Sequence, residues 1–148
     1  MPYRLSIING PNLNMLGTRE PAIYGHTTLA EIERSCRKRA EERAATLLFR
    51  QSNGEGALVD LIQAAREEAD AVIINPAGYS FHSVPILDAM KIFEGPVIEL
   101  HLSNIHARDE LHRHSITSTA ATAVICGLGP YGYLAAMDAA LHLLEQKR

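Results

Sequence analysis

Two groups of residues have the types and spacing needed for proton transfer. The first is Glu99-Leu100-His101-Leu102-Ser103, in which Glu99, His101 and Ser103 would share one face if the segment is a strand. A carboxylate beside an imidazole sets the tautomer of the ring and favours its protonated form. Because three polar residues on one face of an otherwise apolar strand are hard to explain structurally, we interpret His101 as a general acid.

The second group is Arg19 with Tyr24, in a stretch that joins the first apolar run to the first clear helix start. A phenol has a reference pKa near 10, so acting as a base near pH 7 requires roughly 4 kcal/mol of stabilisation of the phenolate. A nearby guanidinium supplies part of it. The alternative is a surface arginine and a half-buried loop tyrosine without chemistry. Residues 9–25 are far longer than the usual strand-to-helix connection of about two to six residues, which favours an active-site lid over about residues 10–26 that contributes little to the core.

The elements that would position these residues alternate strands with helices along five strands. The expected strands are apolar runs near residues 5–8, 46–51, 71–75, 96–102 and 123–126, and the expected helices start near residues 28, 57, 83 and 130. Continuous apolar strands are typical of a parallel sheet that is buried on both faces. With right-handed crossovers, the pattern predicts a doubly wound α/β domain over residues 1–148. Residues 9–24, 75–82 and 99–103 should then face one cleft at the carboxyl ends of the strands.

Composition excludes several classes of function. The net charge of −3 gives no electrostatic reason to expect nucleic acid or a membrane surface as partner. Two cysteines are no disulfide framework and fit a reducing compartment. Neither a signal-peptide pattern nor an apolar run of membrane-spanning length is present in the sequence, so we expect a cytoplasmic enzyme.

Three further chemistries are disfavoured. The spacing of His101, His106, His112 and His114 argues against a metal site, because it fits no standard ligand pattern and arginines lie between them. The G-x-G-x-x-G at residues 127–132 lacks the following strand with an acidic residue that a dinucleotide site needs, so we interpret it as a tight turn. A Schiff-base mechanism has no obvious nucleophile, since Lys38, Lys91 and Lys147 lie on predicted helices.

With these motifs assembled, the chain resembles the type II 3-dehydroquinate dehydratases over nearly its whole length. The resemblance is carried by N-G-P-N-L-N-M-L-G-T-R-E-P from Asn9, followed by Tyr24-Gly25, by Q-S-N-x-E-G at residues 51–56 and by I-N-P-A-G-Y at residues 74–79. It continues through E-L-H-L-S-N-I-H-A-R at residues 99–108. The likeness implies a flavodoxin-like fold, trimers within a dodecamer, and an anti elimination of water through an enolate that uses no cofactor and no metal.

The resemblance also implies roles for single residues. Tyr24 would take the proton from C2 of a β-hydroxy ketone, and Arg19 and Arg108 would lower its pKa. Asn12 would hold the water that stabilises the enolate, and His101, oriented by Glu99, would protonate the departing hydroxyl. The substrate's carboxylate and hydroxyls would be held by residues at the ends of two strands, namely Asn75, Ser103 and the backbone amides of Leu102 and Ser103. Asp88 would reach the active site of a neighbouring subunit.

The chain departs from the family pattern where the substrate's ring hydroxyls would lie. Phe81 stands where the family usually has a histidine, and His112 stands where it usually has an arginine. His82 and Arg113 occur one residue later, so a local shift could restore these contacts. Gly54 also replaces a usual histidine.

Three hypotheses follow from the sequence. The first is dehydration of 3-dehydroquinate, in aromatic amino acid biosynthesis through the shikimate pathway or in quinate catabolism. The second is the same elimination on a less hydroxylated cyclic β-hydroxy ketone carboxylate, since losing a hydrogen-bonding group changes specificity rather than reaction type. The third is a non-enzymatic flavodoxin-like binding module, which is disfavoured because N-G-P-N after the first strand is no phosphate-binding loop.

Overall fold

The computed structural model describes residues 1–18 and 21–147, and for residues 23 and 24 the backbone only. Its centre is a five-stranded parallel sheet with the strand order β2-β1-β3-β4-β5. The strands are β1 (Arg4–Asn9), β2 (Thr46–Gln51), β3 (Ala71–Asn75), β4 (Val97–His101) and β5 (Ala123–Cys126). This is the order of flavodoxin-like folds, so the predicted fold class is confirmed.

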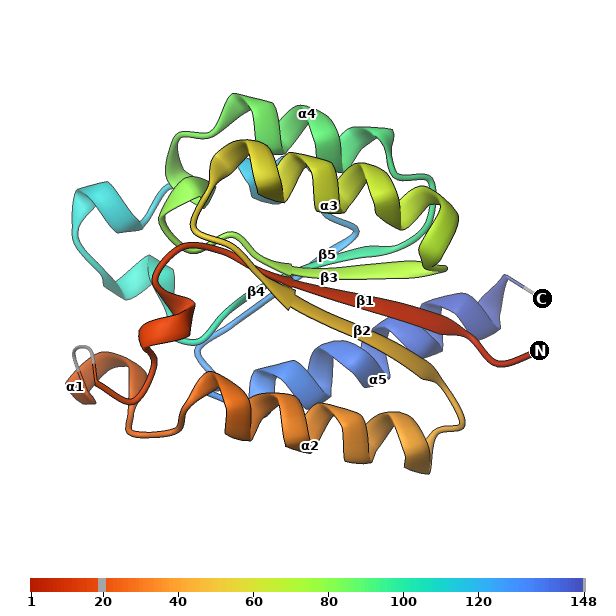
Figure 1. The fold of residues 1–148 in the computed structure, drawn as a ribbon. Helices are drawn as coiled ribbons and strands as arrows, with labels where there is room; N and C mark the ends of the chain where they lie inside the picture. Colours follow the sequence, from red (N-terminus) through yellow and green to blue (C-terminus); the bar gives the residue numbers. More distant parts are fainter. Residues whose placement is uncertain (19–20, 148) are drawn as a thin grey trace.

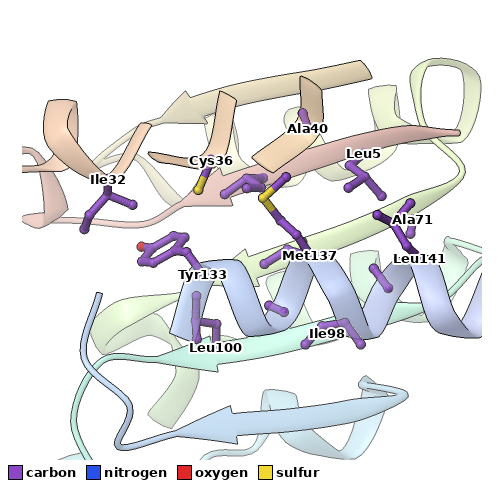
Figure 2. Close-up of a cluster of buried hydrophobic side chains, with 14 of the residues drawn as sticks. Leu5, Ile32, Cys36, Ala40, Ala71, Ile98, Leu100, Tyr133, Met137 and Leu141 are labelled. Carbon is purple, nitrogen blue, oxygen red and sulfur yellow. The ribbon is translucent and has the colours of Figure 1, made fainter. Parts of the chain in front are cut away.

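Helices cover both faces of the sheet. In Figure 1, α2 (Leu29–Glu42) and α5 (Tyr131–Gln146) lie on one side, and α3 (Glu55–Glu68) and α4 (Val84–Ile92) on the other. Each pair closes its own hydrophobic core against alternate residues of the strands. Figure 2 shows the core on the α2 and α5 side, where Tyr133, Met137 and Leu141 of α5 lie between residues of α2, such as Cys36, and strand residues, such as Leu100. None of the helices among the described residues is long and apolar enough to cross a membrane.

Two of the predicted helix starts are capped by side-chain hydroxyls. The Thr28 hydroxyl accepts a hydrogen bond of 3.2 Å from the backbone N–H of Glu31 at the start of α2. At the start of α4, the Ser83 hydroxyl accepts one of 3.1 Å from the N–H of Ile86. Each bond satisfies an N–H that the helix itself leaves unpaired, a contribution of about 1 kcal/mol.

The stretch after β1 contains more structure than the expected lid. A 3-10 turn, η1, spans Leu13–Met15, and a short helix, α1, spans Pro21–Tyr24. Leu13 and Leu16 are each only 4% exposed and belong to the core beneath α2 and α5. The expectation that this stretch contributes little to the core is therefore wrong for its first half, because the surrounding Asn, Gly and Pro residues concealed two buried leucines.

Short 3-10 turns follow β3 and β4. They are η2 (Ala77–Phe81) after β3, and η3 (Ile105–Ala107), η4 (Glu110–His112) and η5 (Thr117–Ala120) between β4 and β5. In Figure 1 the stretch after β1 lies at the same end of the sheet as η3 and η4, opposite the two chain termini. The polar stretch after the fourth strand, for which the sequence predicted no structure, thus lies beside the predicted cleft.

Two glycine-dependent turns fix how the chain leaves the sheet. Gly10 donates its N–H to the carbonyl of Asn75 at 2.8 Å, and a Cβ at position 10 would lie 2.6 Å from the carbonyl oxygen of Pro76. The exits of β1 and β3 are therefore in backbone contact. Between β5 and α5, Gly127 and Gly129 have φ angles of 92° and 61°, which glycine adopts readily, and form the predicted tight turn.

Candidate active site

A small pocket opens at the carboxyl ends of β1, β3 and β4, where the sequence predicted a cleft. Its cavity of about 140 Å³ is below the usual range for drug-sized ligands, about 300–1,000 Å³, so it suits a small substrate. Its walls come from the stretch after β1, from η2 and from the turns after β4. The lining residues are Pro11, Asn12, Leu13, Asn75, Ala77, Gly78, Phe81, His101, Leu102, Ser103, Ile105, Arg108 and His112.

The strand β4 brings a buried acid–imidazole pair to this pocket. Glu99 and His101 are alternate residues of β4, and the Glu99 Oε2 lies 2.9 Å from the His101 Nε2. Glu99 is fully buried and His101 is 4% exposed, so His101 is the member of the pair that reaches the pocket. Because a carboxylate only accepts hydrogen bonds, the proton between them belongs to Nε2. The pair can therefore hold and deliver a proton at the pocket wall.

Hydroxyl groups from the turns before β5 surround the Glu99 carboxylate. Ser115 donates a hydrogen bond of 2.8 Å to Oε2, Ser118 also donates to Oε2, and Thr117 donates to Oε1. Burial alone would raise the pKa of Glu99, but the hydrogen bond and charge of His101, together with the Ser118 and Thr117 hydroxyls, hold that pKa below its usual range. Glu99 is thus kept as an anion within the protein interior.

An aromatic wall closes the pocket beside His101. The ring of Phe81 stacks on the imidazole with a centroid distance of 6.1 Å and an interplanar angle of 28°. Its other neighbour is His112, whose ring meets it edge-on at 5.7 Å. The Nδ1 of His112 also lies 2.8 Å from the Asp109 Oδ1. An apolar ring therefore stands next to the acid, with one imidazole beyond it.

A second buried polar network lies on the opposite face of the sheet, beneath α5. The Tyr133 hydroxyl donates to the Asn9 Oδ1 at 2.7 Å and accepts from the Asn75 Nδ2 at 3.3 Å. Burial is the main cause that raises the pKa of Tyr133 well above its usual value, so the phenol stays neutral. The Asn75 Oδ1 accepts from the N–H of Ala77 at 3.1 Å. Asn75, which lines the pocket, is consequently held from two sides.

The position of Asn12 is fixed from the neighbouring strand. Asn12 has a left-handed backbone with φ of 69°, and its N–H donates to the Asn53 Oδ1 at 2.9 Å. Gln51 donates from its Nε2 to the same Asn53 oxygen at 3.0 Å and to the carbonyl of Gly10 at 3.1 Å. The Q-S-N segment after β2 therefore holds the first turn of the stretch after β1.

Comparison with known proteins agrees with this geometry. The family model described as dehydroquinase class II matches residues 3–141. The chain belongs to the class II dehydroquinase family.

Relatives of this family match along nearly the full chain. A 3-dehydroquinate dehydratase of Caulobacter vibrioides is 49% identical over 141 residues, which cover 95% of this chain and 97% of that protein. The catabolic 3-dehydroquinase 1 of Aspergillus fumigatus is 53% identical over 138 residues, covering 93% and 92%. The crystal structure of a type II dehydroquinase from Butyrivibrio crossotus superposes with a TM-score of 0.93 at 34% identity, covering 95% of this chain and 98% of that one. The resemblance drawn from the sequence motifs is confirmed.

The residues that the family resemblance singled out fall into three groups. Those that line the pocket are Asn12, Asn75, His101, Leu102, Ser103, Arg108 and His112, with Glu99 directly behind His101. Arg19 and the side chain of Tyr24 lie outside the described residues. The pocket lining does not include His82, Asp88 or Arg113; the first two are exposed, and Arg113 forms an ion pair with Glu110.

Two sets of residues that sequence reasoning missed complete the site of this class II dehydroquinase family member. The hydroxyls of Ser115, Thr117 and Ser118 come from a stretch without apolar periodicity, so no pattern marked them. Tyr133 reads as an ordinary core residue of a helix, and only its contacts with Asn9 and Asn75 reveal a polar role. Across residues 1–18 and 21–147, no group of three His, Cys, Asp or Glu side chains could hold a metal ion.

A larger hollow of about 540 Å³ lies at the opposite end of the sheet, around Arg4, Asp70 and Gly95. Two of its charged groups pair with each other, in the 3.1 Å contact between the Arg4 guanidinium and the Asp70 carboxylate. Ligands of open parallel sheets bind at the carboxyl ends of the strands. We therefore take the smaller pocket as the candidate active site.

Proposed function

We propose that this chain is a hydro-lyase that converts 3-dehydroquinate to 3-dehydroshikimate by anti elimination of water through an enolate. The observation that carries the proposal is the buried Glu99–His101 pair at the wall of a small pocket, in a chain that is 49% identical to a protein named 3-dehydroquinate dehydratase. A buried imidazole beside a carboxylate is suited to general acid catalysis. The choice of reaction is supported by the match of this chain to the class II dehydroquinase family.

In the first half-reaction, the phenolate of Tyr24 takes a proton from C2 of the substrate. The electron pair of the broken C–H bond moves toward the C3 ketone and forms an enolate. Arg19 and Arg108 lower the pKa of the phenol, because a neighbouring positive charge favours its ionised form. A water held by Asn12 donates to the enolate oxygen. Support among the described residues comes from Asn12 and Arg108, which line the same pocket.

In the second half-reaction, His101 supplies a proton to the hydroxyl on C1. The enolate collapses, the C1–C2 double bond forms, and the C1–O bond breaks with release of water. His101 is then neutral, and it regains its proton as Tyr24 is deprotonated for the next turnover. A matched base and acid on either side of the bond to be broken are what an enolate mechanism needs.

Binding of the substrate would use the ends of β3 and β4. The side chains of Asn75 and Ser103, with the backbone amides of Leu102 and Ser103, would hold its carboxylate and hydroxyls. We further propose that the chain assembles into trimers within a dodecamer, in which Asp88, exposed on α4, reaches a neighbouring subunit's site. Sedimentation of the purified protein would test the assembly, and a monomer would contradict it.

The direct test is turnover of 3-dehydroquinate, followed by the ultraviolet absorbance of the conjugated enone product. We expect the wild-type protein to be active without added metal or cofactor. Tyr24→Phe removes the proposed base and should nearly abolish turnover while leaving the circular dichroism spectrum unchanged. Negligible turnover by folded wild-type protein would exclude this substrate, and retained activity in Tyr24→Phe would mean that another residue is the base.

A second candidate keeps the reaction and changes the substrate. It is favoured by Phe81, whose apolar ring stands against His101 where the family usually has a histidine, and by His112 behind it. A site without these hydrogen-bonding groups suits a ring with fewer hydroxyls. The variant Phe81→His with His112→Arg should raise kcat/KM for 3-dehydroquinate if this candidate is correct. An unchanged or lower value would favour 3-dehydroquinate as the substrate of the natural site.

A further inference from the structure

The Glu99 carboxylate receives four hydrogen bonds, three on Oε2 and one on Oε1. A carboxylate offers about four lone-pair sites on its two oxygens. The donors are one ring nitrogen and three hydroxyls: His101 Nε2 at 2.9 Å, Ser115 Oγ at 2.8 Å, and the hydroxyls of Thr117 and Ser118. A neutral carboxylic acid would instead have to donate a proton, and one of these four donors would have to turn into an acceptor. The arrangement therefore matches the ionised form.

Ser80 supports the direction of these hydrogen bonds from behind. Its hydroxyl contacts the hydroxyls of Ser115 and Thr117, the latter at 3.0 Å, and lies 3.5 Å from the His101 Nε2. Ser80 has a single hydrogen to donate, and the oxygens of Ser115 and Thr117 can accept it. The hydrogens of Ser115 and Thr117 then remain for Glu99. All of these groups lie at the same buried corner between η2, β4 and η5.

We propose that Ser115, Thr117 and Ser118 are positioning residues that keep Glu99 ionised, so that His101 keeps one proton on Nε2 and exchanges the other at Nδ1. The Nε2 proton stays against Glu99 throughout, which leaves Nδ1 as the nitrogen that can reach a bound substrate. The proton exchange at His101 rests on the proposed function, whereas the ionisation of Glu99 does not.

The other neighbours of Glu99, in the sheet and on α4, are apolar, so the hydroxyls and His101 are the groups that stabilise its charge. The strand neighbours of Glu99 in register are Ile74 and Val124, and the buried residues of α4 are all apolar. His101 is the one titratable side chain with a recorded hydrogen bond to Glu99 within the described ranges. On the pocket side, His101 is faced by the ring of Phe81, while His112 and Arg108 line the same pocket.

A purely structural role for these hydroxyls is the alternative, since η5 also packs against α4. The same turn offers a matched control. The Thr119 hydroxyl donates to the backbone carbonyl of Ile116 at 2.8 Å and has no recorded contact with Glu99. Thr117→Val and Thr119→Val therefore make the same chemical change two residues apart in one turn. Thr117→Ser retains the hydroxyl and serves as the conservative variant.

The experiment is an infrared titration of the Glu99 carboxyl band between pH 3 and pH 7, assigned by its loss in Glu99→Gln. Removing a hydrogen bond to a charged group should move the midpoint upward by about one pH unit in Thr117→Val. Ser118→Ala, at a half-buried position, should move it in the same direction and replaces Thr117→Val if that variant does not fold. Thr119→Val and Thr117→Ser should titrate like the wild type.

Kinetics supply the second measurement. In Thr117→Val, kcat for 3-dehydroquinate should fall further at acid pH than at neutral pH, with KM within about twofold of the wild-type value. Unchanged carboxyl midpoints in Thr117→Val and Ser118→Ala would overturn the inference and leave these hydroxyls a structural role. Wild-type protein without turnover, but with the expected infrared shifts, would instead overturn the proposed function and retain the ionised Glu99.

Discussion

The two buried polar networks at the carboxyl edge of the sheet differ in charge. On the face covered by α3 and α4, Glu99 and His101 form an ionisable pair among hydroxyls. On the face covered by α2 and α5, Asn9, Tyr133 and Asn75 form a network that contains no charge. Both networks reach the same pocket, the first through His101 and the second through Asn75.

The difference separates two tasks that one strand edge has to perform. A charged pair can change its protonation state, which a proton-transfer step requires. Neutral amides and a phenol of raised pKa keep one set of hydrogen bonds at every physiological pH, which suits a group that fixes the position of a substrate. The comparison predicts that damage to the first network acts on rate, and damage to the second acts first on stability.

The largest effect is expected from the charged network. His101→Asn keeps a polar side chain at the pocket but removes the proton donor, so kcat should fall by roughly 100- to 10,000-fold. KM should change little, because the proposed acid acts on the departing hydroxyl. Steady-state kinetics with 3-dehydroquinate measure both constants. A rise in KM with an unchanged kcat would contradict the division of tasks between the two networks.

A smaller effect is expected from the neutral network. Tyr133→Phe leaves the side-chain oxygen of Asn9 (Oδ1) and the side-chain nitrogen of Asn75 (Nδ2) without their buried partner. This should lower the free energy of unfolding by about 1–3 kcal/mol. Urea denaturation at pH 7 measures this cost. The matched control is Tyr131→Phe in the same helix, where the side chain is exposed and the change should stay within about 0.5 kcal/mol. Equal stabilities for the two variants would contradict the structural role of Tyr133.

The smallest effect concerns the dependence of stability on pH. The pKa of Glu99 is lower in the folded protein than in the unfolded chain, where it is about 4.3. Its contribution is therefore fully present above about pH 5 and is lost as the pH falls through the folded pKa. Since this group binds at most one proton, its titration changes the free energy of unfolding by no more than about 1.4 kcal/mol per pH unit. Denaturation midpoints from pH 3 to pH 7 should show a flatter acid limb for Glu99→Gln than for the wild type.

Much of this architecture was predictable because it depends on local patterns. The strands are continuous apolar runs. Thr28 and Ser83 mark the starts of helices, because their hydroxyls can cap the first turn. The pairing of Glu99 with His101 follows from their alternation along one strand. The carboxyl-end rule then brings Asn12, Asn75 and His101 together without any knowledge of side-chain contacts.

The rest depends on contacts between segments far apart in the sequence. Ser115, Thr117 and Ser118 reach Glu99 across 16 to 19 positions, through 3-10 turns that have no hydrophobic period. Tyr133 meets Asn9 over 124 positions, and its place in an apolar helix gives no sign of a polar partner. Leu13 and Leu16 were hidden by the turn residues around them. No local signal distinguishes such residues from their neighbours.

The close approach at Gly10 has a consequence for how the site tolerates change. Since the backbones leaving β1 and β3 touch there, a methyl group at position 10 would collide with the Pro76 carbonyl oxygen. Gly10→Ala would have to push the two exits apart and carry Asn12 away from the wall that holds Asn75. Small displacements of this kind are costly to catalysis even when no reacting group is altered. Gly10, which has no side chain, therefore sets the distance between the exits of β1 and β3, which form two walls of the candidate active site.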